Sequence, residues 1–275
     1  MKKRRRRLLI LLIIMVLLVG CWWFNTFTLT QNVISIADDK IKGAVTIVQI
    51  TDLHGASFGQ NNQQLIDKIA EAQPDLIAVT GDMYSAGDNA GQATALALLA
   101  TLADEYPVYY VNGEHDNDEA FHQDLVANGV HVLNYQSEEI VVNGTSLCLY
   151  GINNMYYSPT FDLANEFTLD PEKYNILLAH ASNFAAFSAF GIDLSLCGDT
   201  HGGQIRLPFI GALNNRGVWF PEMTAADNGE AEYTKGLYSD EEHQLFISSG
   251  LGNYPLPFRL FNRPEIAVIH LVPAE

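Results

Sequence analysis

The stretch Val45-Thr46-Ile47-Val48-Gln49-Ile50-Thr51-Asp52-Leu53-His54 decides the fold of this chain of 275 residues. Its first six residues form an apolar, β-rich run that is typical of a strand. Asp52 and His54 follow at once, and their spacing on an extended segment points both side chains to one face. The stretch therefore predicts a strand that delivers a carboxylate and an imidazole together at its carboxyl end.

Apolar runs and helical patterns alternate along the rest of the chain. Apolar residues recur at helical spacing in residues 63–73, which stop at Pro74, and a second helix is predicted for residues 93–105. Further strands are predicted for residues 76–79, 108–111, 146–150, 176–178, 194–197, 245–247 and 266–271. This alternation predicts an α/β fold with at least one partly parallel sheet.

Polar clusters follow several of these predicted strands. The clusters are Asp52-Leu53-His54, Gly81-Asp82, Gly113-Glu114-His115-Asp116, His180 and Gly198-Asp199-Thr200-His201-Gly202-Gly203. In open α/β sheets, ligands bind at the carboxyl ends of strands. One such Asp or His is most often a turn former or a helix cap, but five clusters in succession are hard to attribute to turns. We therefore expect a functional site at this edge.

The residue types in these clusters indicate metal chemistry. Carboxylates and imidazoles suit Zn, Fe, Mn and similar divalent ions, and one carboxylate, that of Asp82, can bridge two of them. Two cations about 4 Å apart bind phosphoryl oxygens, lower the pKa of a water and stabilise a leaving oxygen. The pattern thus predicts a dinuclear site suited to phosphoester hydrolysis.

The ordered set of motifs resembles the calcineurin-like metallophosphoesterase superfamily. The phrases Asp199-Thr200-His201-Gly202-Gly203-Gln204-Ile205-Arg206-Leu207-Pro208 and Asn262-Arg263-Pro264-Glu265 further resemble its bacterial membrane-anchored branch. The resemblance spans about Val45 to the C-terminus. It implies an α/β fold that is a four-layer sandwich of two mixed β-sheets flanked by helices. It also implies a phosphodiesterase or phosphatase that acts on a phosphoester substrate.

The resemblance assigns roles to eight residues by position. It implies that one metal is held by Asp52, His54, Asp82 and His201, and the other by Asp82, Glu114, His180 and Asp199. His115 would interact with the scissile phosphate or protonate the leaving group.

Two of these positions depart from the family pattern. Glu114 stands where the family usually has Asn, and Asp199 stands where it usually has His. Two added carboxylates make that metal site harder and more anionic, which favours Mn, Mg or Ca over Zn. We expect two divalent ions, with manganese first and Fe, Zn or Mg as alternatives. The departures leave two interpretations open: an enzyme with a harder second metal, or a catalytically weak module that binds or senses a cell-envelope component.

The N-terminus predicts a membrane anchor. The basic residues Lys2–Arg7 precede an apolar run that extends from Leu8 through Phe24, and residues 8–29 are long enough to span a bilayer. Lys and Arg stay on the cytoplasmic side, so the N-terminus is predicted inside and the rest of the chain outside the cell membrane. The alternative is a lipoprotein signal with lipid on Cys21, because Leu18-Val19-Gly20-Cys21 resembles a lipobox.

These observations divide the chain into three parts. Residues 1–30 are expected to be the basic segment and the anchor, residues 31–42 a polar stalk, and residues 43–275 the metallophosphoesterase domain. A substrate derived from lipid or from the cell envelope would suit a site tethered near the membrane. A transport or structural subunit would leave the polar clusters unexplained.

Charge and cysteine content exclude other classes. Outside the N-terminal basic cluster, nine basic residues against 32 acidic ones leave a charge of −23, which repels nucleic acid, so no nucleic-acid partner is expected. Cys148 and Cys197 lie in apolar runs and are predicted to be buried thiols, with one disulfide as the alternative.

Four further residues have two interpretations each. Arg206 and Arg263 are interpreted either as phosphate ligands or as surface partners of acids. Tyr156 and Tyr157 either line a pocket or cover a sheet edge. The remaining histidines are expected to pack or to lie on the surface, and they are His122, His131, His243 and His270.

Overall fold

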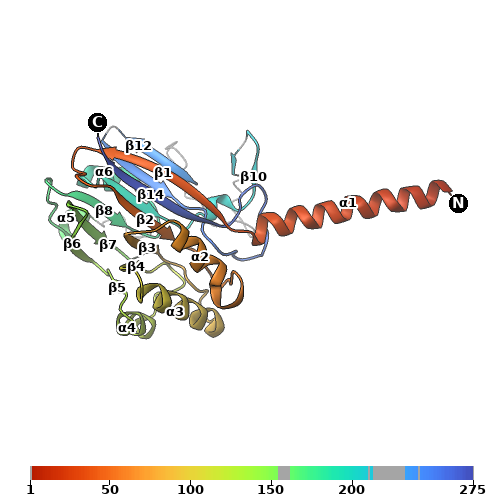
Figure 1. Cartoon of the computed structure of the whole chain (residues 1–275), viewed down its shortest axis with the longest axis horizontal. Coiled ribbons are helices and arrows are strands. Elements are labelled where there is room, and N and C mark those ends of the chain that lie inside the picture. The colour runs from red at the N-terminus through yellow and green to blue at the C-terminus, as the bar shows by residue number, and fades with distance from the viewer. Residues whose placement is uncertain (1, 154–161, 210, 213–232, 241, 275) are drawn as a thin grey trace.

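A long helix projects from one end of an α/β body in the computed structural model (Figure 1). The structure describes residues 2–153, 162–209, 211–212, 233–240 and 242–274. Helix α1 (Lys2–Phe27) is long and apolar enough over Lys3–Phe27 to cross a membrane, with a mean hydropathy of 2.6, although a signal sequence has the same properties. The predicted apolar N-terminal segment is therefore a single exposed helix.

The first sheet contains the strand that decides the fold. Its order is β1-β14-β2-β3-β4-β5, and β2 is parallel to β3, β3 to β4 and β4 to β5, whereas β14 runs antiparallel to β2. The strands are β1 (Thr30–Asp38), β14 (Glu265–Pro273), β2 (Val45–Ile50), β3 (Leu76–Thr80), β4 (Val108–Val111) and β5 (His131–Val132). Sheet one is thus mixed, and its parallel centre carries three of the polar clusters at one edge.

The second sheet has the same size and is also mixed. Its order is β12-β13-β9-β8-β7-β6, with antiparallel pairs at both ends and parallel pairs between. The strands are β12 (Gly236–Asp240), β13 (His243–Ile247), β9 (Leu194–Cys197), β8 (Tyr174–Leu178), β7 (Thr145–Gly151) and β6 (Gln136–Val142). A small hairpin joins β10 (Arg206–Leu207) to β11 (Gly211–Ala212).

Helices cover the outer face of each sheet. On sheet one lie α2 (Gln63–Glu71), α3 (Asn89–Ala103) and α4 (Glu119–Ala127), whose buried Leu65, Leu98 and Phe121 share a core with β2 and β3. On sheet two lie α5 (Leu163–Glu166) and α6 (Phe184–Phe190). The 3-10 turns are η1 (Gln60–Asn62) and η2 (His201–Gly203). The predicted four-layer sandwich is confirmed.

Strand β2 shows why its sequence is apolar on both sides. Alternate residues point to opposite faces, so Ile47 enters the core between the sheets while Val48 enters the core beneath the helices. Both side chains are fully buried. A strand buried on both faces reads as a continuous apolar run, as in residues 45–50.

The segment predicted as a polar stalk is a strand instead. Most of residues 31–42 belongs to β1, which pairs in parallel with β14 from Thr30–Glu265 to Asp38–Pro273. Ile36 is buried between the sheets, whereas Val33 is 56% exposed. The polar residues between the apolar ones hid this alternation.

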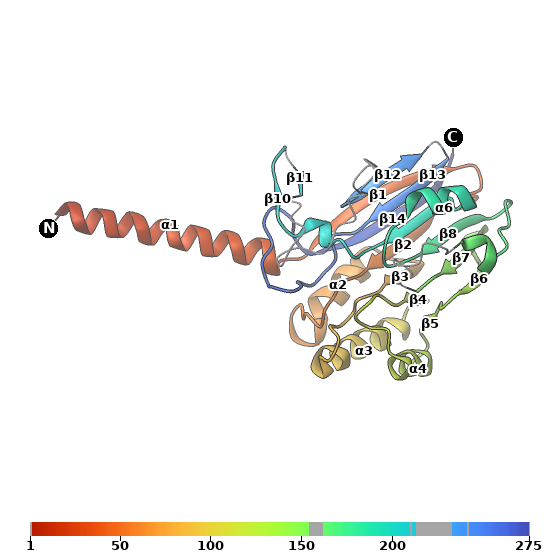
Figure 2. The same cartoon turned by 180° about the vertical axis from the view of Figure 1, so that it is seen from behind.

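The pairing of β1 fixes where the N-terminal helix meets the body. Thr30 lies opposite Glu265 at the start of β14, and β2 runs antiparallel to β14 with Gln49 opposite Ala267. The start of β1 and the carboxyl end of β2 therefore lie at the same edge of the sheet. Figure 2 shows α1 leaving the body at that edge, beside the β10–β11 hairpin.

The cysteines behave as predicted. Cys148 and Cys197 are both buried free thiols, and burial raises the pKa of both. No disulfide joins them.

Candidate metal centre

The polar clusters follow five strands that all end at one region of the two sheets. Asp52 and His54 follow β2, Asp82 follows β3, and the pair Glu114 and His115 follows β4. His180 follows β8, and Asp199 and His201 follow β9 in the second sheet. The site therefore lies where the carboxyl ends of both sheets meet, as the sequence predicts for an α/β fold.

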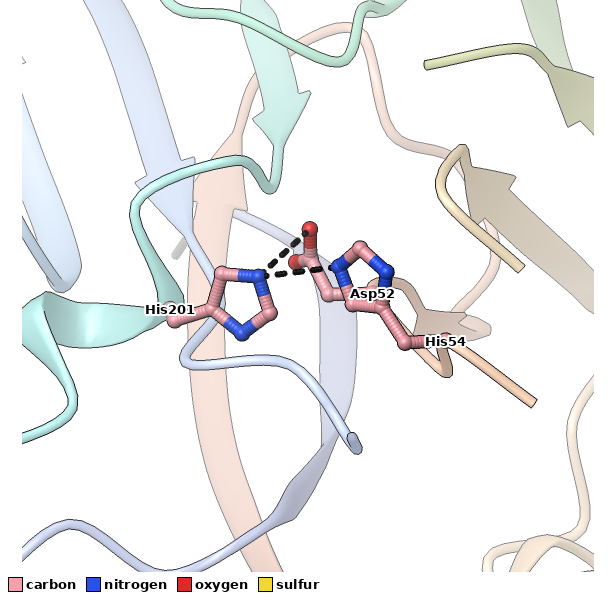
Figure 3. Close-up of side chains that lie close together, drawn as sticks. All are labelled: Asp52, His54 and His201. Atoms are coloured by element: carbon pink, nitrogen blue, oxygen red, sulfur yellow. Dashed lines mark hydrogen bonds and ion pairs between the residues drawn. The ribbon is translucent and has the colours of Figure 1, made fainter. Parts of the chain in front are cut away.

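One group of side chains is rich in imidazole. Asp52, His54 and His201 each offer a ligand atom, and these atoms lie within 4.8 Å of one another. His201 Nε2 lies 3.1 Å from His54 Nε2 and 3.7 Å from Asp52 Oδ1 (Figure 3). We call Asp52, His54 and His201 the imidazole-rich half-site.

A second group lies on the other side of Asp82. His180 Nε2 is 3.3 Å from Asp82 Oδ2, 3.8 Å from Asp199 Oδ1 and 4.0 Å from Asp52 Oδ1. We call His180 and Asp199, together with Glu114 as the ligand that the resemblance implies, the carboxylate-rich half-site. Asp82 Oδ2 also lies 3.7 Å from His54 Nε2, so this carboxylate is close to an imidazole of each half-site.

The backbone at these positions adopts the left-handed region. Asp52, His54, Asp82, Asp199 and His201 have φ between 45° and 69°, which costs a non-glycine residue about 1 kcal/mol or more. Nearby glycines allow close approach, because a Cβ on Gly113 would lie 2.0 Å from Asp82 Oδ1 and one on Gly250 would lie 2.6 Å from Asp52 Cβ. Such strain concentrates at functional sites.

Hydrogen bonds orient the ligand side chains from behind. His180 Nδ1 lies 2.7 Å from the Thr80 carbonyl, so Nδ1–H donates there and Nε2 faces the carboxylates. The His115 backbone N–H donates to Asp82 Oδ1 at 2.9 Å. Asp116, which received no role from the sequence, is fully buried and accepts from the backbone N–H groups of Met83 and Gly113, both at 2.7 Å.

The two half-sites differ in how burial affects their imidazoles. Burial lowers the pKa of His54 to about 3 and that of His201 well below its ordinary value, so both rings are neutral. Burial also acts to lower the pKa of His180, but Asp82, Asp52 and Asp199 outweigh it and raise that pKa. Burial raises the pKa of Asp52 to about 7. The carboxylates thus attract positive charge into the centre.

Two buried atoms show that these residues fit a bound metal. Asp52 Oδ2 and His180 Nε2 have no hydrogen-bond partner among the described residues, and both side chains are fully buried. A buried polar atom without a partner costs roughly 1–3 kcal/mol, and a cation removes this cost for an oxygen and a ring nitrogen alike. The donor set, carboxylate oxygen with neutral imidazole, suits divalent transition ions.

The two departures from the family pattern lie at the outer side of the centre. The Asp199 side chain is 25% exposed and faces His180, whereas the Glu114 side chain is 47% exposed. Glu114 Oε1 lies 3.4 Å from His115 Nε2, and Glu114 belongs to none of the compact ligand groups of the described residues. Its assignment as a ligand stays a prediction.

The loop between β13 and β14 adds two residues that sequence reasoning missed. The Tyr254 ring stacks on His54 with centroids 4.9 Å apart and lies 4.5 Å from the His115 ring. Arg259 is fully buried, and its Nη2 donates to the Gly252 carbonyl at 2.6 Å and lies 3.5 Å from His201 Nδ1. The one signal in the sequence was an arginine flanked by apolar Phe258 and Leu260.

The two arginines singled out in the sequence, Arg206 and Arg263, bind backbone and hydroxyl groups. Arg206 Nη1 donates to the Gly202 carbonyl at 2.9 Å, which steadies the turn after His201. Arg263 Nε donates to Thr28 Oγ1 at 2.9 Å, at the end of α1. Neither interpretation from the sequence, phosphate binding or pairing with acids, describes these contacts. Tyr156 and Tyr157 lie outside the described residues.

The remaining histidines make ordinary packing contacts, as expected. His122 is buried against Tyr110 and lies 3.2 Å from the Asp116 carbonyl. His131 pairs with Glu138 at 2.9 Å. His243 Nδ1 lies 2.9 Å from the Ile192 carbonyl, and His270 Nδ1 lies 3.1 Å from Thr46 Oγ1.

A four-layer α/β sandwich with aspartates and histidines gathered at the carboxyl ends of both sheets defines the class of metallophosphoesterases. The chain belongs to the calcineurin-like phosphoesterase family, which matches residues 45–203. The resemblance of the motifs to the calcineurin-like superfamily is thereby confirmed.

Two relatives bear the word metallophosphoesterase in their names. The chain is 28% identical over 255 residues to the Bacillus subtilis protein named "Uncharacterized metallophosphoesterase YkuE", covering 89% of this chain and 83% of that protein. It is 28% identical to a "Putative metallophosphoesterase" of Caenorhabditis elegans, but spans only 48% of that protein's length and 82% of its own. Among solved structures, it is similar to the sulfate thiohydrolase SoxB of Thermus thermophilus, with a TM-score of 0.46, 13% identity, and coverage of 76% of this chain and 52% of that one.

Proposed function

We propose that the protein is a metal-dependent phosphoester hydrolase, a phosphodiesterase or phosphatase, with a dinuclear centre. The observation that carries the proposal is the position of Asp82, whose Oδ2 lies 3.3 Å from His180 Nε2 and 3.7 Å from His54 Nε2. A single carboxylate within reach of two ligand groups is the arrangement that two neighbouring ions require.

The residues divide between the two ions as follows. Asp52, His54 and His201 would hold one ion, His180, Glu114 and Asp199 the other, and Asp82 both. When bound, two divalent ions supply positive charge toward phosphoryl oxygens and lower the pKa of a water. Because the carboxylate-rich half-site has acidic oxygen ligands, we propose Mn first, with Fe, Zn or Mg as alternatives.

His115 is the proposed catalytic acid. Its Nε2 faces Glu114 Oε1 at 3.4 Å, and its side chain is 15% exposed, so the ring borders both the centre and the solvent. The backbone N–H of His115 is held by Asp82, which ties the ring's position to the centre. From there, Nε2 can hold a proton and donate it to the leaving oxygen of the ester.

The location of the site follows from the N-terminal helix. We propose that residues 8–29 span the cell membrane with the N-terminus inside, and that the catalytic domain is extracytoplasmic. Lipid attachment at Cys21 is the alternative anchor, and the catalytic domain lies on the outer side of the membrane in either case. The phosphoester would then come from a lipid or from another component of the cell envelope.

The test uses the full chain in detergent micelles, stripped of metal and reloaded with Mn, Mg, Fe or Zn. We expect turnover of a generic aryl phosphodiester or monoester, and metal analysis should find two ions per chain. His115→Ala should lower kcat about 10²–10⁴-fold while both ions remain. His131→Ala is the matched control, because His131 is an exposed histidine outside the centre.

A metal-binding module without efficient catalysis is the second candidate. The exposure of Glu114, outside the compact ligand groups, favours it, since the carboxylate-rich half-site then lacks one close ligand. Full occupancy by two ions with no turnover of either ester, for any of the four metals, would establish the module and reject the hydrolase.

A further inference from the structure

Exposed aromatic side chains gather beside the candidate metal centre. Outside α1, the exposed Phe and Tyr side chains of the described residues are Phe209, Tyr254, Phe258 and Phe261, and Leu256 is exposed between them. Four of these five residues lie on the loop between β13 and β14, and Phe209 lies at the turn of the β10–β11 hairpin. A monomer in water rarely leaves its large apolar side chains in one place unless that place binds something.

Hydrogen bonds join this loop to the end of the apolar helix. Trp22 Nε1 donates to the Pro257 carbonyl at 2.9 Å, and the Phe261 backbone N–H donates to Asn25 Oδ1 at 2.8 Å. The hairpin is joined to the same loop, because the Arg206 backbone N–H donates to the Leu260 carbonyl at 2.9 Å. The loop that carries the exposed residues therefore adjoins the end of α1, and Figures 1 and 2 show this loop and the β10–β11 hairpin beside that end.

We name this surface the apolar rim, and it consists of Phe24 and Phe27 of α1 together with Phe209, Leu256, Phe258 and Phe261. Phe209 and Phe261 are the most exposed of the six, and the other four are each more than 40% exposed. Arg263 lies 4.5 Å above the Phe24 ring, so the rim carries a guanidinium at its border with the helix.

The charge of the rim differs from that of the rest of the body. Residues 200–212 and 250–264 contain no Asp or Glu, although the chain has 32 acidic residues. Of their three arginines, Arg206 and Arg263 are partly exposed, whereas Arg259 is fully buried. A surface that is apolar, free of acids and edged by arginine suits a bilayer with phosphate head groups, which an acidic surface would repel.

The apolar rim is also adjacent to the candidate metal centre. Tyr254, on the same loop, stacks on His54 and lies against His115. Strand β1 starts directly after α1, at the same end of the sheet at which β2 ends before Asp52. A bilayer that reaches the rim would place its head groups next to the metal centre.

We propose that the apolar rim inserts into the surface of a lipid bilayer and so presents membrane-embedded phosphoesters to the centre. The occupant is a bilayer with phosphate head groups, and the substrate class is an amphiphilic phosphoester whose tail stays in the membrane. This specificity rests on the proposed hydrolase function, whereas the contact between the rim and the bilayer does not.

The contact is tested by tryptophan fluorescence in the full chain. Phe258→Trp adds a reporter to the rim, and Val141→Trp adds one to β6, where Val141 is 72% exposed and remote from α1 in the fold. Both proteins are reconstituted in vesicles of phosphatidylethanolamine and phosphatidylglycerol with or without brominated acyl chains. The parent chain, with its three tryptophans, supplies the background to subtract.

We expect brominated lipid to quench the added emission at residue 258 and to leave that at residue 141 unchanged. Equal emission at residue 258 in both kinds of vesicle would overturn the proposal. The emission could instead shift to the blue as the density of protein in the vesicles rises, without quenching by brominated lipid. This result would also overturn the proposal, because it would show that a second copy of the chain covers the rim.

The substrate class is tested by comparing two esters. For Leu256→Ser with Phe258→Ser, the ratio of activity on a phospholipid in vesicles to activity on a soluble aryl ester should fall about tenfold or more, because each large apolar side chain withdrawn from lipid changes the equilibrium by roughly that factor. Val126→Ser with Val141→Ser changes two apolar residues away from the rim that are even more exposed, at 60% and 72%, and should keep the parent ratio.

The two arms separate the possible failures. If the parent hydrolyses neither ester, the proposed function fails, and the quenching result still decides whether the rim meets the bilayer. If the parent hydrolyses the soluble ester and the rim variant keeps the parent ratio, the substrate class is wrong and the hydrolase stands.

Discussion

The two half-sites of the candidate centre differ in the type of their ligands and in the exposure of their side chains. The imidazole-rich half-site has side chains that are at most 3% exposed, whereas Asp199 and Glu114 of the carboxylate-rich half-site are 25% and 47% exposed. The first offers neutral imidazoles in fixed positions, and the second offers negative charge at a more open edge. Variants of the shared carboxylate and of each half-site test whether this difference matters for metal binding.

Asp82→Asn should have the largest effect, because we propose that Asp82 holds both ions, and its Oδ2 lies near an imidazole of each half-site. Replacing it removes a negative charge from between two cations, so we expect both ions to bind more weakly and kcat/KM to fall about 10³-fold or more. Metal analysis after dialysis and steady-state kinetics check this. Asp67→Asn, on the surface of α2, is the control. Retention of both ions at parent affinity would show that Asp82 is not shared.

Arg259→Met should weaken metal binding at the imidazole-rich half-site and leave the carboxylate-rich half-site unchanged. Arg259 reaches the Gly252 carbonyl and His201 Nδ1, so its removal disturbs the support of the imidazole-rich half-site alone. Loss of a supporting partner lowers metal affinity roughly 10–100-fold. Titration of the stripped protein should show one weakened ion and one unchanged ion. If both ions weaken equally, Arg259 supports the fold as a whole and not one half-site.

Glu114→Asn combined with Asp199→His should have the smallest effect on rate and a clear effect on metal choice. The double change replaces two carboxylates by an amide and an imidazole, which favours Zn or Fe over Mn. We expect kcat to stay within about tenfold of the parent with the preferred metal, since the other ligands are intact. Activity profiles across Mn, Mg, Fe and Zn measure the shift. Identical profiles in parent and variant would remove Glu114 and Asp199 from a common site.

The sequence predicted the parts of the site that follow buried strands. Strands β2, β4 and β9 have the predicted bounds, because a strand buried on both faces is a continuous apolar run that ends where the polar residues begin. Asp52, Asp82, His180 and His201 follow such runs, and the parallel arrangement brings them together. Their proximity is what the family motifs imply.

Three parts of the structure could not be predicted from the sequence. Strand β1 was predicted as a stalk, because its half-buried, alternating residues include polar ones at both faces. Tyr254 and Arg259 lie about 200 residues after Asp52, on a loop with no periodic pattern, and only tertiary contacts bring that loop over the histidines. Asp116 was in a predicted cluster, but its role in holding Met83 and Gly113 depends on two backbone N–H groups that no motif reveals.

The parallel pairing of β1 with β14 has a consequence for biosynthesis. Among the described residues, the first strand after the N-terminal helix pairs in its sheet with β14 alone. During translation, residues 30–38 cannot form this pairing until the ribosome has released residues 265–273. In a nascent chain stalled before residue 265, the N-terminal helix would be complete, but β1 would lack the strand with which it pairs.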